Sequence, residues 1–185
     1  MRCSNTIVPG FEETSKIKNP GLAAKLEFAL RKGEVEAFHG SPDKNIKEFK
    51  LGKKAKNRTG NPAGIYSAAN IDEARSYGDN VYRLGVEKGK VFDLQSKNRH
   101  KYPITKSMVD KYKEVLPRNG YTLDWANKSG IISDFKKTGK MKPISSEDKR
   151  AVFLAGGYDT LLDSHFGKRH YVSLHPEAVR IREYL

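Results

Sequence analysis

The chain has 185 residues, of which 37% are hydrophobic and 31% are charged, and its formal net charge is +13. This length suits one domain with a sizeable core, and the charge predicts attraction to polyanions: nucleic acid, acidic protein surfaces or a phosphate-bearing cofactor, unless the protein is simply basic with no dedicated partner. Cys3 is the single cysteine and no apolar run reaches membrane-spanning length, so an internal disulfide and a transmembrane helix are both excluded.

The first part of the chain is predicted to carry one helix and one strand. Residues 1–19 contain turn signals and look irregular, whereas residues 20–32 have the apolar spacing of a helix that begins at a proline. Residues 34–39 alternate polar and apolar side chains, so we expect a strand with His39 at its end. The following segment, 43–58, is rich in lysine and arginine. It indicates either a solvated surface or a basic loop beside a bound phosphate.

The next stretch carries two tyrosines on adjacent elements. Residues 64–68 read as a short strand that follows a turn signal and includes Tyr66. Asn70 can cap a helix that runs on to Tyr77, with Glu73 placed as in a capping box. Strand and helix would bring the two tyrosines into one neighbourhood.

The remainder of the chain is predicted to contain further strands and a helical region. The expected strands cover residues 81–86, 91–94, 158–162 and 170–174. Residues 96–155 are expected to be mainly helical, with helices over 107–116, around Gly130, and from 145 or 146 to 156. The five histidines and Cys3 show no metal-ligand spacing, so no metal is expected.

Three separated motifs resemble the catalytic domain of the poly(ADP-ribose) polymerases, which belong to the diphtheria-toxin-like ADP-ribosyltransferases. The first is His39-Gly40, the second is Gly64-Ile65-Tyr66 with Tyr77 eleven residues later, and the third is the stretch from His170 to Val179. The resemblance implies an α+β fold: an ADP-ribosyltransferase-like split antiparallel sheet with flanking helices and a helical insertion over 96–155. Residues 1–33 would be an N-terminal extension with one helix, and residues 34–185 the catalytic domain.

The resemblance also implies how NAD, as the substrate, would be held. His39 would hydrogen-bond a ribose, the backbone of Gly40 would contact the nicotinamide amide, and the rings of Tyr66 and Tyr77 would enclose the nicotinamide. The basic loop would lie over the phosphates. The predicted cofactor-binding residues are His39, Gly40, Ser41, Lys53, Lys54, Tyr66 and Tyr77.

Two positions depart from the pattern of the family. His170 stands where the family has its catalytic glutamate, and Ala74 stands where many polymerase-type members have a serine that hydrogen-bonds the nicotinamide amide. A neutral imidazole can still hydrogen-bond the ribose but brings no negative charge. The predicted catalytic residues are therefore His39, Tyr66 and His170. Chain-elongating polymerisation is not expected, because family members that lack the glutamate transfer one ADP-ribose or are inactive.

The predicted function is NAD-dependent transfer of one ADP-ribose onto a macromolecule, either protein or nucleic acid. One alternative is NAD hydrolysis, as in toxins that deplete the cofactor, and another is an inactive module that binds NAD, ADP-ribose or nucleic acid. We expect a monomer without membrane association. Because residues 1–20 lack the apolar region of a signal peptide, a cytoplasmic location is expected, and delivery as an effector stays open.

Overall fold

The computed structural model describes residues 30–51, 62–98, 100–165 and 168–185. The helix predicted over residues 20–32 lies almost entirely outside these ranges, and so do Lys53 and Lys54.

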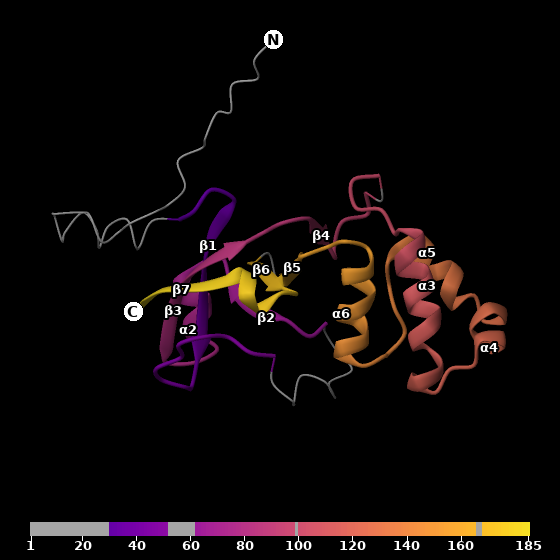
Figure 1. The fold of residues 1–185 in the computed structure, drawn as a ribbon, viewed down its shortest axis with the longest axis horizontal. Coiled ribbons are helices and arrows are strands. Elements are labelled where there is room, and N and C mark those ends of the chain that lie inside the picture. Colours follow the sequence, from indigo (N-terminus) through magenta and orange to yellow (C-terminus); the bar gives the residue numbers. More distant parts are fainter. Residues whose placement is uncertain (1–29, 52–61, 99, 166–167) are drawn as a thin grey trace, which may run out of the picture.

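The protein has an α+β fold built on a mixed, mostly antiparallel sheet of seven strands (Figure 1). The strands are β1 (Glu34–Ser41), β2 (Ile65–Ala68), β3 (Asn80–Glu87), β4 (Val91–Asp93), β5 (Thr160–His165), β6 (Lys168–Ser173) and β7 (Val179–Tyr184). Their order across the sheet is β4-β5-β6-β2-β1-β3-β7, and only β4 and β5 are parallel to each other.

The sheet has a weak junction near its middle, between β1 and β2. These two strands share a single registered pair, Phe38 with Ala68, whereas β1 pairs with β3 along its full length from Glu34 to Ser41. The junction therefore separates a β4-β5-β6-β2 half from a β1-β3-β7 half. Four of the predicted site residues lie on the two strands that border it: His39, Gly40 and Ser41 on β1, and Tyr66 on β2. His170 lies on β6, and Tyr77 follows α2.

Five α-helices accompany the sheet in the described residues. They are α2 (Ile71–Arg75), α3 (Lys106–Val115), α4 (Leu123–Lys128), α5 (Ile131–Thr138) and α6 (Ser146–Ala155). The last four form within the stretch predicted to be helical, and α4 and α5 flank Gly130, as expected from the apolar spacing there. None of the described helices has the length and apolar character needed to cross a bilayer.

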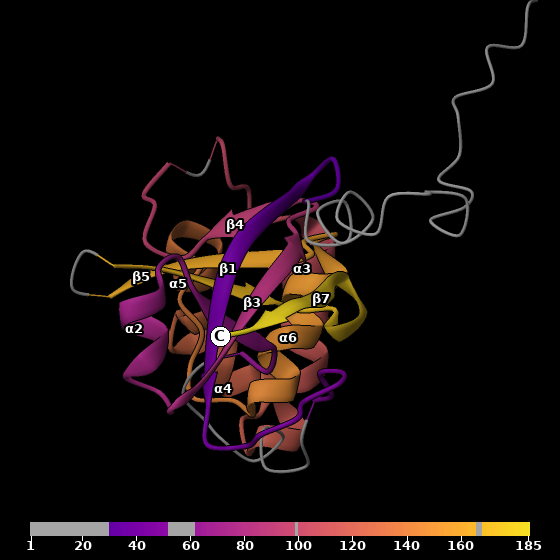
Figure 2. The ribbon, with the colours of Figure 1, turned by 90° about the vertical axis from the view of Figure 1, so that its left-hand side faces the viewer.

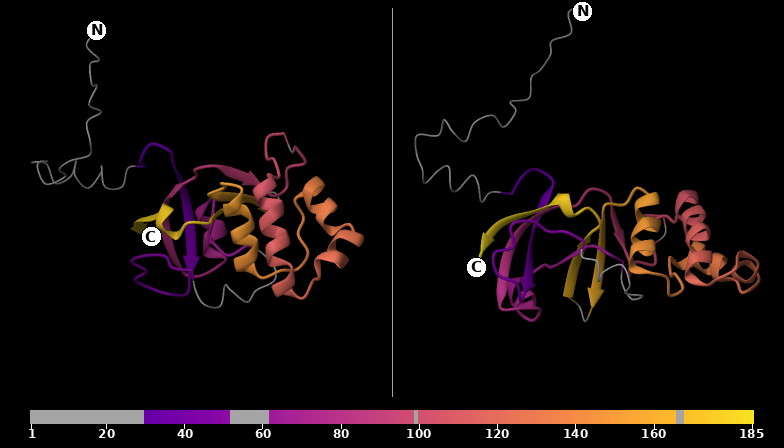
Figure 3. Two further views of the ribbon diagram at one scale, coloured as in Figure 1. Left: turned by 45° about the vertical axis from the view of Figure 1, so that its right-hand side comes forward. Right: turned by 60° about the horizontal axis from the view of Figure 1, so that its bottom comes forward.

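The helices α3 to α6 pack against the β4-β5-β6 half and enclose the main core. Figure 3 shows α6 between the strands and the outer helices in both views. Apolar side chains repeat at helical spacing along α3 and fill this core together with a residue of α6 and residues of the strands: Met108, Val109, Tyr112 and Val115 of α3, Phe153 of α6, and Leu161 and Val172 of β5 and β6. Burial of one such face stabilises each helix more than its own propensity does.

The short helix α2 covers the other half of the sheet, beside β1 (Figure 2). Its Ala74 packs against Phe38 of β1, Ala68 of β2 and Val81 of β3. Because Ala68 is paired with His170 of β6, which shares a face with Val172 of the main core, α2 lies on the same face as the helices α3 to α6. The opposite face of β1 and β3 is covered by the segment from Ile46 to Leu51.

Two features of the sheet lie outside the prediction from the sequence. The C-terminal strand β7 was not predicted, although Val179 and Ile181 alternate with polar residues and pack on the sheet core. The strands β3 and β4 follow one another around Gly89 without pairing, because β4 crosses to the far edge and joins β5. Such pairings are non-local, so the periodicity of the sequence does not encode them directly.

Candidate functional site

The site is built on an unusually close approach between α2 and β1. A Cβ atom on Gly40 would collide with the carbonyl oxygen of Ala74, and one on Gly78 would collide with the backbone of Ser41. Glycine at both positions therefore lets α2 rest directly on the strand. This packing is a structural reason for glycine at position 40 that does not depend on a ligand. It also holds Glu73, the neighbour of Ala74, against the sheet.

The helix α2 begins as predicted but ends earlier. The Asn70 side chain accepts a hydrogen bond from the backbone N–H of Glu73 at 2.9 Å, which caps the first turn. The helix stops at Arg75, and Tyr77 follows in a tighter turn whose backbone N–H donates to Ala74. In a capping box the carboxylate of Glu73 would in turn accept a hydrogen bond from the backbone N–H of Asn70. Here that carboxylate contacts His170 instead.

His170 lies at the start of β6 and faces α2. Its Nε2 is 2.6 Å from Oε1 of Glu73, and the two side chains are only 11% and 3% exposed. A carboxylate oxygen can only accept, so Nε2 carries a hydrogen and donates a hydrogen bond to Oε1 of Glu73. The hydroxyl of Tyr77 lies 3.4 Å from the same nitrogen, at the edge of hydrogen-bonding distance. The buried contact is thus a charge-assisted hydrogen bond that fixes the imidazole.

A second buried carboxylate flanks His170 from β5. Asp163 is paired directly with His170 across the strands, so both side chains lie on the same face of the sheet. Its Oδ1 accepts a hydrogen bond from the Gln95 amide at 3.0 Å. His170 therefore stands between two buried acidic residues, Glu73 on α2 and Asp163 on β5.

Among the described residues, no donor reaches the second carboxylate oxygen of Glu73. This oxygen, Oε2, is buried. Buried carboxylate oxygens are ordinarily satisfied, since desolvating them without a donor is costly. The unsatisfied oxygen lies on the carboxylate that already binds His170, so the cluster of Glu73, Tyr77 and His170 has an unused acceptor. We call these three residues the His170 cluster.

His39 lies on the other side of the junction between β1 and β2. Its Nδ1 donates to the backbone carbonyl of Tyr66 at 2.8 Å, and its ring meets the ring of Phe49 edge-on with 4.8 Å between centroids. Burial lowers the pKa of His39, and the hydrogen bond to Tyr66 opposes this effect only in part. With its proton on Nδ1, the neutral ring keeps Nε2 as an acceptor. Along β1 the His39 side chain points to the face opposite Phe38, hence opposite the His170 cluster.

The two tyrosines occupy different environments. The Tyr66 hydroxyl donates to the carbonyl of Pro62 at 2.5 Å, and its ring packs against the main core. Tyr77 is 60% exposed and meets the His170 ring nearly at right angles, with 6.2 Å between centroids. Tyr77 therefore offers an accessible aromatic surface next to the His170 cluster, whereas Tyr66 contributes its backbone carbonyl to His39.

Ser41, the remaining predicted site residue in the described part, serves the turn after β1. It is buried, and its hydroxyl accepts a hydrogen bond from the backbone N–H of Asp43 at 3.0 Å. Its carbonyl accepts from the Asn80 side chain at 3.2 Å. These contacts fix the chain where it leaves β1 for the basic segment.

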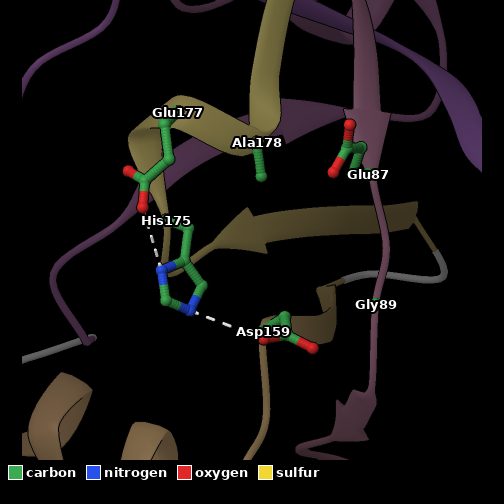
Figure 4. Close-up of a pocket in the computed structure, with 6 residues that line it drawn as sticks. All are labelled: Glu87, Gly89, Asp159, His175, Glu177 and Ala178. Carbon is green, nitrogen blue, oxygen red and sulfur yellow. Dashed lines mark hydrogen bonds and ion pairs between the residues drawn. The ribbon is translucent and has the colours of Figure 1, made fainter.

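A separate cavity of about 370 Å³ lies beyond the other end of β6 (Figure 4). His175 spans its wall, 3.5 Å from Asp159 and 3.2 Å from Glu177, and Glu87 projects from the opposite side. In the described residues no group of three or more histidine, cysteine or acidic side chains is arranged to hold a metal ion.

Sequence reasoning missed Glu73 and Asp163 as members of the site. The sequence places Glu73 in a capping box, and its i+3 spacing from Asn70 does not indicate a partner on a strand 97 positions later. Asp163 could have been found from the sequence, because it follows two leucines in a predicted strand and shares a face with the buried Leu161. An acidic residue on a buried face of a strand indicates a functional position.

Comparison with known proteins gives a likeness of fold. No family model matches the chain, and no curated protein matches its sequence. Among solved structures, the chain is similar to one described as the crystal structure of an anti-CRISPR protein, with a TM-score of 0.51 and 15% sequence identity. The match covers 84% of this chain and 98% of the other. At this identity, the two proteins share a fold, and the comparison assigns no family.

Proposed function

We propose that the protein transfers a single ADP-ribose from NAD to a macromolecular acceptor. The observation that carries this proposal is that residues of three separated motifs meet around the β1–β2 junction. His39 donates to the backbone of Tyr66, and Tyr77 approaches His170, 93 positions further along the chain. Because the two groups lie on opposite faces of the sheet, a dinucleotide would contact both only by passing between β1 and β2, which share a single registered pair.

The side chains have the chemistry that such a substrate requires. The exposed ring of Tyr77 suits stacking against a flat nicotinamide, which is bound through area and geometry. The neutral His39 has an acceptor nitrogen suited to a ribose hydroxyl. Lys53 and Lys54, which lie outside the described residues, remain the predicted partners of the phosphates.

Transfer of one unit fits the site better than chain elongation. Cleavage of the nicotinamide–ribose bond passes through a cationic, oxocarbenium-like state. His170 stands where the polymerases that this chain resembles have a glutamate, and its Nε2 already donates a hydrogen bond to Glu73. The ring therefore does not offer this nitrogen to a growing polymer chain.

Labelled NAD distinguishes transfer from its alternatives. The protein is incubated with NAD labelled in the adenylate moiety and with cell lysate, and the products are digested separately by nuclease and by protease. We expect label on a macromolecule that one of the two digestions releases. Nicotinamide release without macromolecular label would identify an NAD hydrolase, and binding without nicotinamide release would identify a non-enzymatic module.

Inhibition of a CRISPR system is a second candidate function. It rests on the solved structure described as an anti-CRISPR protein, 98% of which is covered by the match. A CRISPR interference assay with the purified protein, run with and without NAD, tests it. Inhibition that requires NAD would indicate that the protein inhibits the CRISPR system by ADP-ribose transfer. Equal inhibition with and without NAD would indicate that it inhibits by binding alone.

A further inference from the structure

Cleavage of NAD demands a negative charge that His170 cannot provide. As nicotinamide departs, positive charge grows at the anomeric carbon, and a fixed carboxylate nearby lowers the energy of that state. Within the described residues around His170, the buried carboxylates are those of Glu73 and Asp163. One of them is expected to serve the reaction.

The hydrogen bonding favours Glu73. Its Oε1 is held by Nε2 of His170 at 2.6 Å, so the carboxylate is fixed in place, and its buried Oε2 has no donor among the described residues. Asp163, in contrast, is engaged by the Gln95 amide on Oδ1. Tyr77, whose exposed ring approaches the same His170, follows Glu73 by four residues, about one helical turn. An oriented carboxylate with a spare acceptor is what a ribose hydroxyl would satisfy.

We propose that Glu73 is the catalytic carboxylate of this site, held in place by His170, with Oε2 accepting a hydrogen bond from a ribose hydroxyl of NAD. This inference rests on the proposed transferase function. In the transfer step the bond between the nicotinamide nitrogen and the anomeric carbon breaks, and its electron pair leaves with neutral nicotinamide. An oxygen or nitrogen of the acceptor bonds to that carbon, and the acceptor's proton passes to water. The negative charge of Glu73 stabilises the cation between these events.

Variants that remove the carboxylate at position 73, or move it to position 170, test the catalytic role of Glu73. Glu73→Gln keeps a group that accepts from His170 but removes the charge, so kcat for nicotinamide release should fall about 10- to 1000-fold while KM for NAD changes little. The double variant Glu73→Gln/His170→Glu returns a carboxylate to the pair from the strand side and should regain about tenfold or more of that loss. A purely structural pair would show no such rescue.

Glu36→Gln is the matched control. Like Glu73, Glu36 is a glutamate whose carboxylate is held by a basic side chain, but it lies on β1 and its partner is Arg83 of β3. This variant should keep the wild-type kcat. Thermal unfolding of every variant shows whether it is folded, and the double variant decides the question if Glu73→Gln alone does not fold.

The outcomes separate the two proposals. Full kcat in folded Glu73→Gln, or a folded double variant no more active than Glu73→Gln, would overturn the role of Glu73 while transfer by the wild type stands. A wild-type protein that binds NAD but releases no nicotinamide would overturn the transferase itself, and the role of Glu73 with it.

Discussion

At the scale of single residues, burial sets the chemistry of His39. The ring is largely removed from water, which lowers its pKa, and Nδ1 is committed to the carbonyl of Tyr66. The folded protein therefore holds His39 neutral at a pH where the unfolded chain begins to take up a proton. This difference links the protonation of one side chain to both binding and stability.

The stability of the protein should depend on His39 below about pH 6.5, the ordinary pKa of the side chain. Because the folded-state pKa is lowered, the stabilisation is fully present above the unfolded pKa and is lost as pH falls toward the folded value. Urea unfolding of the wild type and of His39→Gln, at about pH 7.5 and about pH 5, measures it. The variant should lose less stability between the two conditions. An equal loss in both proteins would contradict the assignment.

Tyr77 is the residue expected to bind the nicotinamide ring. Tyr77→Ala should weaken NAD binding by about 1–3 kcal/mol, the size of a lost aromatic stack. Tyr77→Phe should retain most of the affinity, since it keeps the ring and loses only the hydroxyl near His170. Calorimetric titration of NAD gives both values, and unchanged affinity in Tyr77→Ala would remove Tyr77 from the site.

At the scale of elements, α2 connects the sheet to the site. Asn70 starts this helix, Gly40 and Gly78 let it touch β1, and Ala74 packs it onto the sheet. The helix has only five residues, so these contacts rather than its own propensity hold it. The position of Glu73 is thus a consequence of how closely the helix approaches the strand.

Gly40→Ala should displace α2. The new methyl group would meet the carbonyl oxygen of Ala74, which belongs to backbone and cannot rotate away. We expect a loss of about 1–3 kcal/mol in the free energy of unfolding, the usual effect of overpacking, and lower nicotinamide release because Glu73 moves with the helix. Urea unfolding and kinetics check the two effects. Unchanged values of both would mean that α2 is not seated by this contact.

Local elements were predictable from the sequence, whereas their partners were not. The cap at Asn70, the helix start at Ser145 or Ser146 and the apolar spacing of α3 are short-range signals, and the structure contains those elements, with Ser145 as the cap of α6. The parallel pairing of β4 with β5 and the contact between Glu73 and His170 join segments far apart in the chain. Such contacts depend on the assembled fold, which is why a residue suited to capping a helix was not recognised as part of the site.

At the scale of the whole molecule, the net charge of +13 favours anionic partners. The lysines of the basic segment 43–58 could act on the NAD phosphates or on a nucleic-acid acceptor, and these two roles have different signatures. Neutral replacements of Lys53 and Lys54 should raise KM for NAD if the segment lies over the cofactor. If it binds nucleic acid instead, KM should stay constant and the salt dependence of nucleic-acid binding should flatten. No change in either quantity would leave the segment as solvated surface.

The most direct measurement of transferase activity is the amount of nicotinamide released from NAD, compared with the amount of ADP-ribose found on macromolecules by mass spectrometry in the same reaction. For the wild type we predict equal amounts of the two products, with single ADP-ribose units on each modified position. The double variant His39→Ala/Tyr77→Ala should yield neither product. Nicotinamide release by the wild type no greater than that of this double variant would contradict transfer of ADP-ribose by this protein.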